Sequence, residues 1–149
     1  MSDNYLRLIP ISPEYIPETL ASEEAQRQLS AFVPHADEVK VIITDEIEFV
    51  DQGGNFERVV CPLCERELDI GWWQEAMDAA YATRFASLVV DLPCCHNESS
   101  LNSLRYEWPA GFARFVLEAR NPGTDLNEAQ VHALEQILGC ALRKIWVHY

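Results

Sequence analysis

The chain has 149 residues, 48% hydrophobic and 23% charged, and 24 acidic against 11 basic residues give a net charge of −13. This length and composition fit one domain with its own hydrophobic core and argue against wholesale disorder. No apolar run approaches the roughly 20 residues that span a bilayer, and no signal peptide is recognisable, so we predict a cytoplasmic protein. The negative charge disfavours nucleic acids and anionic membranes as partners, but it is compatible with a basic protein partner.

The first third of the chain predicts one strand, one helix and two further strands. Residues 5–9 alternate loosely between apolar and polar side chains and end at a proline, as a short strand does. A helix is predicted from Ser22 to Phe32, because Ser22 can cap it and the glutamates that follow suit its positive end. Residues 39–44 and 47–50 are rich in residues that favour strands and are too short for helices, so each predicts a strand.

The middle of the chain predicts two strands that lead into cysteines, with a helix between them. A turn at residues 52–55 precedes a strand at 56–60, which we expect to pair back on residues 47–50 as a hairpin. A helix with one apolar side is predicted over residues 72–85. The compact apolar run at residues 88–90 predicts the second strand.

The last third of the chain holds the clearest strand and the clearest helix. Over residues 112–120, small or apolar side chains alternate with charged ones, which is typical of a half-buried strand in an antiparallel sheet. From Leu126 to Trp146, apolar residues recur at the i, i+3, i+4, i+7 spacing of one buried helix face. Thr124 or Asp125 is the expected cap of this long amphipathic helix.

The order of these elements predicts an α+β fold. Strands and helices intermix with hairpin connections and without regular βαβ alternation, so we expect a mainly antiparallel sheet packed by helices, including the long C-terminal helix. The sequence shows no internal repeat, low-complexity run or linker. Residues 1–149 are therefore predicted as a single domain, with a possible zinc-bearing insertion at residues 61–103.

Five cysteines carry most of the chemical information: Cys61, Cys64, Cys94, Cys95 and Cys140. An odd number of cysteines in a chain without an export signal argues against a disulfide framework and directs attention to metal or redox chemistry. Cys140 lies in a segment of strong helical periodicity and is expected to be a buried apolar residue. The other four form two clusters, each just after a predicted strand.

The two clusters together suggest the ligand set of a zinc ion. A Cys-Pro-Leu-Cys motif supplies half of a tetrahedral site, and the Cys-Cys-His that follows the second strand would supply the rest. If residues 94–96 are extended, adjacent side chains point apart, and Cys94 with His96 is the easier pair of ligands. A tight turn would instead bring the thiolates of both Cys94 and Cys95 to the ion. The predicted zinc ligands, in order of preference, are Cys61 and Cys64, then Cys95 and Cys94, with His96 as a substitute for one of these. The result would be a zinc-ribbon-like pair of loops.

A redox enzyme is the alternative interpretation. A strand followed by Cys-Pro-Leu-Cys also resembles the CPxC motif of glutaredoxins, which would make Cys61 and Cys64 a thiol oxidoreductase pair. The carboxylates after Cys64 would raise the pKa of a thiolate, Gly71 interrupts the expected helix, and the second cysteine cluster would have no role. Zinc hydrolase and deaminase motifs are absent from the sequence, and a saturated cysteine site is usually structural. We therefore predict no catalytic residue.

The segment from residue 59 to residue 120 resembles a group of small bacterial zinc-ribbon-like proteins. The likeness rests on the Cys-Pro-Leu-Cys of residues 61–64, the Pro-Cys-Cys of residues 93–95 and the Tyr-x-Trp-Pro-x-Gly-Phe-x-Arg-Phe of residues 106–115. The resemblance implies paired cysteine loops and no particular activity. In size and charge alone, the chain is also similar to immunity proteins that neutralise toxic nucleases.

These observations predict a non-catalytic zinc protein that acts by binding another protein. The most specific partner that we expect is a basic toxin or nuclease, because opposite charge speeds association and sets specificity. Acidic residues across the expected hairpin form either a solvated face or a docking surface for such a partner. These residues are Asp45, Glu46, Glu48, Asp51 and Glu57.

Overall fold

The computed structural model describes residues 3–149. In chain order, the elements are β1 (Asn4–Pro10), α1 (Thr19–Phe32), β2 (Glu38–Val50), β3 (Arg58–Val60), α2 (Ile70–Tyr81), β4 (Val89–Asp91), β5 (Glu98–Ser100), β6 (Arg105–Glu107), β7 (Gly111–Arg120), α3 (Glu128–Leu138) and β8 (Leu142–His148). Within this described part, no helix has both the length and the apolar character needed to traverse a bilayer. The predicted α+β class is confirmed.

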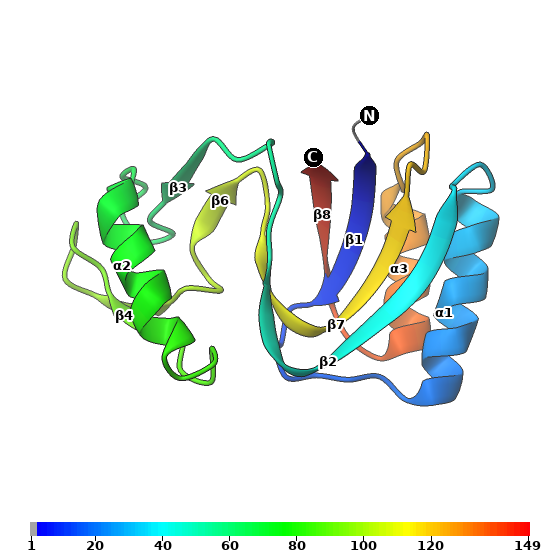
Figure 1. Ribbon diagram of the computed structural model, residues 1–149, viewed down its shortest axis with the longest axis horizontal. Coiled ribbons are helices and arrows are strands. Elements are labelled where there is room, and N and C mark those ends of the chain that lie inside the picture. Colours follow the sequence, from blue (N-terminus) through cyan, green and yellow to red (C-terminus); the bar gives the residue numbers. More distant parts are fainter. Residues whose placement is uncertain (1–2) are drawn as a thin grey trace.

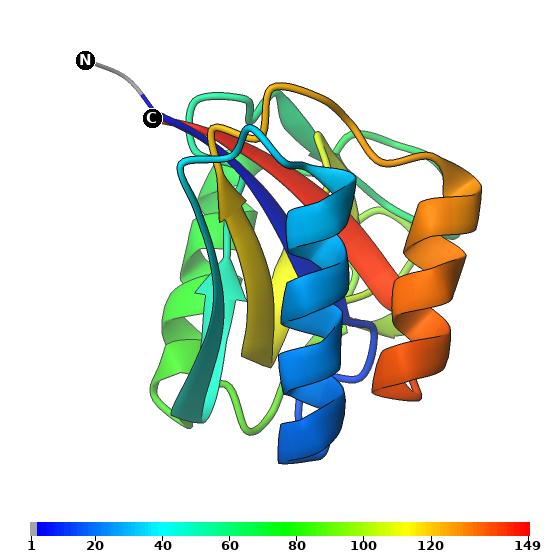
Figure 2. The same ribbon diagram turned by 90° about the vertical axis from the view of Figure 1, so that its right-hand side faces the viewer.

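The centre of the fold is a four-stranded sheet in the order β2-β7-β1-β8, with every neighbouring pair antiparallel. Helices α1 and α3 lie side by side against one face of this sheet (Figure 2). Alternate residues of the central strands point to that face, where they pack with the helices into one apolar cluster. Its fully buried members include Leu6, Leu8, Leu29, Phe115, Leu117 and Leu134.

The second part of the fold is the segment between β2 and β7, residues 51–110, which we call the cysteine lobe. It contains α2 and two small antiparallel pairs, β3 with β6 and β4 with β5. The lobe lies beside the sheet, on the side away from α1 and α3 (Figure 1). It has an apolar cluster of its own, to which Ile47 of β2 and Phe112 of β7 also belong. The predicted insertion at residues 61–103 lies inside this segment.

The strand predictions were correct in position but not always in pairing. Residues 39–44 and 47–50 belong to one strand, β2, whose register against β7 shifts between Ile43 and Glu48. This irregularity bends the strand, as an inserted residue does. The predicted hairpin between residues 47–50 and 56–60 is wrong, because β3 pairs with β6.

The long C-terminal helix is also wrong. Helix α3 ends at Leu138, and Gly139 follows in the left-handed conformation at φ +75°, with its N–H bonded to the carbonyl of Glu135. The chain then forms β8, which pairs with β1 along its whole length. Beyond the glycine, the buried residues are Ile145 and Val147, two apart as in a strand, so the apparent helical spacing there was coincidental.

The helix caps differ from the predicted ones. Helix α1 starts at Thr19, three residues before the predicted cap Ser22, whose buried hydroxyl donates instead to the carbonyl of Glu18. Helix α3 is capped by a box formed by Asn127 and Gln130 rather than by Thr124 or Asp125. The residue before α1, Glu18, makes no capping bond with its side chain.

Gly139→Ala is expected to cost more stability than Gly123→Ala. Both glycines adopt a left-handed conformation, at φ +75° and +74°, which costs any L-residue about 1–2 kcal/mol. A Cβ on Gly139 would lie 3.1 Å from the Tyr15 hydroxyl oxygen, whereas a Cβ on Gly123 meets nothing within 4 Å. Urea titration of the two variants measures the difference, and equal losses of unfolding free energy would contradict the steric contribution of Tyr15.

Candidate metal centre

Four of the five cysteines come together in the cysteine lobe. The sulfur atoms of Cys61, Cys64, Cys94 and Cys95 all lie within 4.8 Å of one another. Cys61 Sγ is 3.9 Å from Cys95 Sγ, and Cys64 Sγ is 3.2 Å from Cys94 Sγ. Four sulfurs at about 2.3 Å from a tetrahedral zinc ion would be about 3.8 Å apart, whereas a disulfide needs about 2.05 Å. The group therefore has the dimensions of a metal site, and all its thiols are free.

The first pair of cysteines lies on a tight loop at residues 61–66, directly after β3. The Cys61 N–H donates to the carbonyl of Arg66 at 2.9 Å, and the Glu65 N–H donates to the carbonyl of Cys61 at 3.1 Å. Glu65 turns the chain at φ +63°. The amides of Leu63 and Cys64 both lie 3.4 Å from Cys61 Sγ, so the loop folds back around this sulfur.

The second pair lies on a loop of the same conformation at residues 92–97, between β4 and β5. The Leu92 N–H donates to the carbonyl of Asn97 at 2.8 Å, and the His96 N–H donates to the carbonyl of Leu92 at 2.9 Å. His96 turns the chain at φ +58°, as Glu65 does in the first loop. The two loops therefore have equivalent backbone hydrogen bonds at each position, although no repeat is apparent in the sequence.

The match between the loops explains why the second ligand pair is adjacent in sequence. Cys95 occupies the position of Cys64, whereas the position of Cys61 is taken by Leu92, which is buried in the lobe core. Cys94 supplies the fourth sulfur from the middle of the turn. The backbone here is the predicted tight turn, and not the extended chain that would favour Cys94 with His96. Residues 61–64 and 92–95 share a pattern of an apolar residue or cysteine, proline, any residue and cysteine. This pattern was the sequence signal that could have revealed the turn.

The predicted substitute ligand, His96, and the fifth cysteine, Cys140, lie outside the group. His96 is the turning residue of the second loop and is exposed, and it does not belong to the four-residue cluster. Cys140 follows the end of α3, far from the cysteine lobe in the fold, and is half-buried as expected of a packing residue. Burial and the neighbouring Glu135 carboxylate raise the pKa of the Cys140 thiol, which keeps it protonated.

The thiols of Cys61 and Cys94 have strongly shifted pKa values. Burial raises the pKa of Cys61, but the amides of Cys64 and Leu63 and the neighbouring thiols stabilise its thiolate, so its pKa falls to about 6. Burial and the negative charge of Cys61 raise the pKa of Cys94 to about 12. Four such groups cannot all ionise without a cation between them, because like charges this close repel. A divalent ion would remove this repulsion and bind the deprotonated set.

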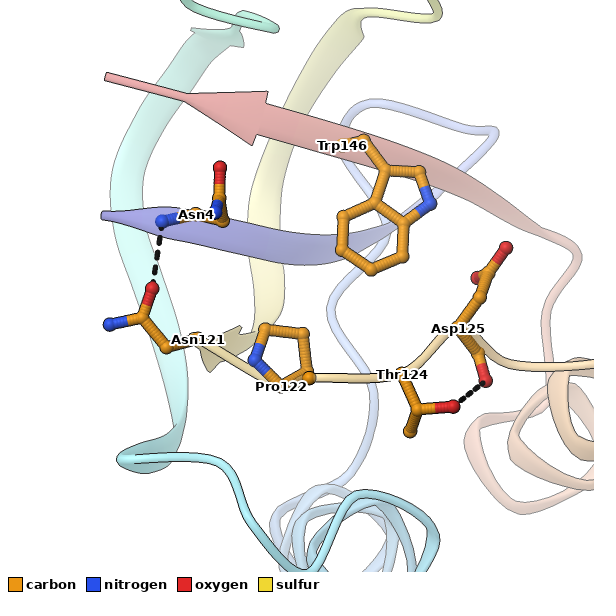
Figure 3. A pocket seen from close by; sticks show the side chains of 7 residues that line it. Asn4, Asn121, Pro122, Thr124, Asp125 and Trp146 are labelled. Carbon is orange, nitrogen blue, oxygen red and sulfur yellow. Dashed lines mark hydrogen bonds between the residues drawn. The ribbon is translucent and has the colours of Figure 1, made fainter. Parts of the chain in front are cut away.

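A hollow beside the loop that leads into α3 carries no comparable chemistry. It measures about 400 Å³ and lies next to Trp146, between the start of β1 and the loop before α3 (Figure 3). Several of its polar groups are already bonded to one another or to neighbours. The Asn4 N–H donates to Asn121 Oδ1 at 2.9 Å, and Asp125 accepts from Lys144 Nζ at 2.8 Å. We assign no ligand to this hollow.

Comparisons with known proteins do not place the chain in a family. No family model matches it, and neither a curated protein nor a solved structure is significantly similar to it. The cysteine group and the charge of the chain are therefore the features that bear on its function.

Proposed function

We propose that the chain is a non-catalytic zinc protein, in which one Zn²⁺ bound by four thiolates holds the two cysteine loops together. The supporting observation is the approach of Cys61, Cys64, Cys94 and Cys95 to within 4.8 Å of one another. Thiolate sulfur is a soft ligand that favours zinc, and four protein ligands close its coordination shell. A closed shell leaves no position for a water or a substrate, so the ion would stabilise the lobe without taking part in a reaction.

The burial of Cys61 supports this role over a thiol oxidoreductase. The first cysteine of a CPxC enzyme is the attacking thiolate and must be reachable, whereas Cys61 is 0% exposed. Such an enzyme also places a helix directly after the motif. Here the chain turns at Glu65, and Glu67 pairs back with Val60. The lowered pKa of Cys61 suits a metal ligand equally well, because zinc binds the thiolate.

Protein purified without chelator or added metal is expected to contain about one zinc per chain. Cys64→Ser is expected to lower that content sharply because it removes one of four ligands, and His96→Ala, in the adjacent turn, should leave it unchanged. Elemental analysis of the three proteins measures this. Metal-free wild-type protein that cycles a Cys61–Cys64 disulfide would support the oxidoreductase instead, and zinc loss in His96→Ala would contradict the proposed ligand set.

The charge of the chain supports a basic protein as the partner. Of the 24 acidic residues, all of which lie in the described part, Glu118 alone is buried. The others leave a strongly negative surface, and a zinc ion bound by four thiolates would add about −2 more. Such a surface speeds the approach of a positive partner and repels acidic ones. An immunity-type inhibitor of a basic toxin or nuclease is the most specific form of this role, and size and charge support it.

The partner proposal predicts salt-sensitive association. A strongly basic protein is expected to co-purify with the chain from its source cells at low ionic strength, and its association rate should fall steeply as sodium chloride is added, because salt screens the attraction. Surface plasmon resonance with the identified partner measures this rate. Absence of any partner at low salt, or a partner whose association rate does not change with salt, would count against the proposal.

A further inference from the structure

A hollow of about 400 Å³ lies between the cysteine lobe and the edge strand of the sheet. One wall comes from β6 and the residues around it, and the other from β8, which Figure 1 shows at the side of the sheet nearest the lobe. The lining includes Arg105 and Tyr106 of β6, Ala110, and Arg143 and Lys144 of β8. Hollows of this size hold small-molecule ligands.

The lining has the opposite charge to the rest of the protein. Three of the 11 basic residues line this hollow, and none of the 24 acidic residues does. Acidic residues outnumber basic ones more than two to one in the chain, so the hollow is a local reversal of its charge. Positive side chains facing a hollow concentrate anions there, and salt screens the repulsion from acidic residues more than about 10 Å away.

Arg143 is the central group of this lining. Its Nη1 donates to the carbonyl of Ala110 at 2.9 Å and to Asn102 Oδ1 at 3.1 Å, and both acceptors are neutral. Within residues 3–149 no carboxylate forms an ion pair with it, and burial lowers its pKa. A partly buried guanidinium without an anionic partner is unfavourable, and a bound anion would supply that partner. Its Nε and Nη2 donors remain available for a bidentate contact.

Of the other two basic residues, Arg105 is the one that can add charge to the hollow. Arg105, on β6, lies 3.8 Å from the Glu65 carboxylate and 3.7 Å from that of Glu107, and such exposed, long pairs are weak. Lys144 follows Arg143 on β8, so its side chain points to the opposite face of the sheet, where its ammonium donates to Asp125 Oδ1 at 2.8 Å and to the carbonyl of Leu126 at 3.1 Å. Arg105 is therefore the more available of the two.

We propose that this hollow binds an oxyanion group, a phosphate or a carboxylate, carried by a small molecule. Arg143 anchors the anion through its planar fork, and Arg105 adds charge from the cysteine lobe. Because Arg105 belongs to the lobe and Arg143 to the sheet, a bound anion joins the two parts of the fold. This inference is independent of the zinc ion, since none of the lining residues is a cysteine.

The test is titration of the purified, metal-containing protein with sodium phosphate and, separately, sodium acetate at constant ionic strength, followed by NMR chemical shifts. The two salts distinguish a phosphate site from a carboxylate site. Arg143→Gln is expected to weaken binding of the preferred anion at least about tenfold, because charged hydrogen bonds are lost. Arg105→Gln changes a half-exposed side chain, so it keeps the fold testable if Arg143→Gln does not fold, and it should weaken binding several-fold.

Arg58→Gln is the matched control. Arg58 lies on β3, opposite Glu107 of β6, and it does not line the hollow. Its loss should leave the affinity unchanged. The proposal is overturned if neither anion binds at millimolar concentration, if Arg105→Gln leaves the affinity unchanged, or if all three variants weaken binding equally, which indicates diffuse attraction to positive charge.

Discussion

Cys61→Ser is expected to release the zinc ion and to lower the free energy of unfolding on the order of 4 kcal/mol. An ion present at 1,000 times its dissociation constant stabilises the folded state by about 4.1 kcal/mol, and this stabilisation disappears when the site no longer forms. Cys61 is the best choice because it is fully buried and its sulfur is the one around which the first loop folds. Guanidinium titration, with zinc measured in the same samples, tests the expectation.

Cys140→Ser provides the matched control for this variant. Cys140 is a cysteine outside the group, at the junction of α3 and β8, and its replacement should leave the zinc content unchanged and cost about 1 kcal/mol or less. Wild-type protein treated with a strong chelator should fall to the stability of Cys61→Ser. If the two serine variants lose equal stability and both keep their metal, the ion does not stabilise the lobe.

Phe112→Ala is expected to cost about 3–5 kcal/mol, the usual loss for a large buried aromatic residue. Phe112 is 0% exposed, and its ring centroid lies 5.0 Å from that of Phe49 and 5.2 Å from that of Phe85. It belongs to β7 of the sheet but packs in the cluster of the cysteine lobe. Its removal therefore loosens the contact between the two parts, and thermal and urea unfolding measure the loss.

Phe56→Ala is the comparison for this prediction, because Phe56 lies at the rim of the same lobe. It is 36% exposed and stacks on Trp73 with ring centroids 6.1 Å apart. Less apolar surface is lost there and water can fill the space, so the cost should be about 1 kcal/mol. A loss as large as that of Phe112→Ala would mean that the rim, and not the junction with β7, carries the stability of the lobe.

The sheet could be predicted where the sequence repeats with a period of two. Residues 112–120 alternate clearly and form β7, although both faces of this strand are buried. On the face expected to be exposed, Glu118 is buried and accepts a hydrogen bond from Arg7 Nε at 2.7 Å. Residues beyond Gly139 could not be assigned correctly by period alone. Their apolar side chains fit both a helix and a strand, and pairing with β1, a contact distant in sequence, decides the outcome.

The cysteine group could be predicted in part from spacing. A CPxC motif after a strand identifies the first pair without further information. The second pair depends on the backbone of residues 92–97, where His96 adopts a positive φ that residues other than glycine seldom adopt. The only sequence signal for that turn is the proline and cysteine spacing that residues 92–95 share with residues 61–64. Without the backbone of both loops, this spacing does not decide between Cys94 and His96. The reversal of charge around Arg143 was equally hidden, because its contributors are distant in sequence.

The position of the cysteine lobe links the order of its two cysteine loops to the pairing of strands in the sheet. Val50, the last residue before the lobe, stands directly opposite Gly111, the first residue after it. The lobe thus takes the place of a hairpin turn between two paired strands. Each doubling of a connection costs about 0.6 kcal/mol in closure entropy, so a span as long as residues 51–110 costs about 2–3 kcal/mol more than a tight turn. When the two cysteine loops are held together, fewer residues of the lobe are free. The entropy cost of bringing β2 and β7 together is then smaller.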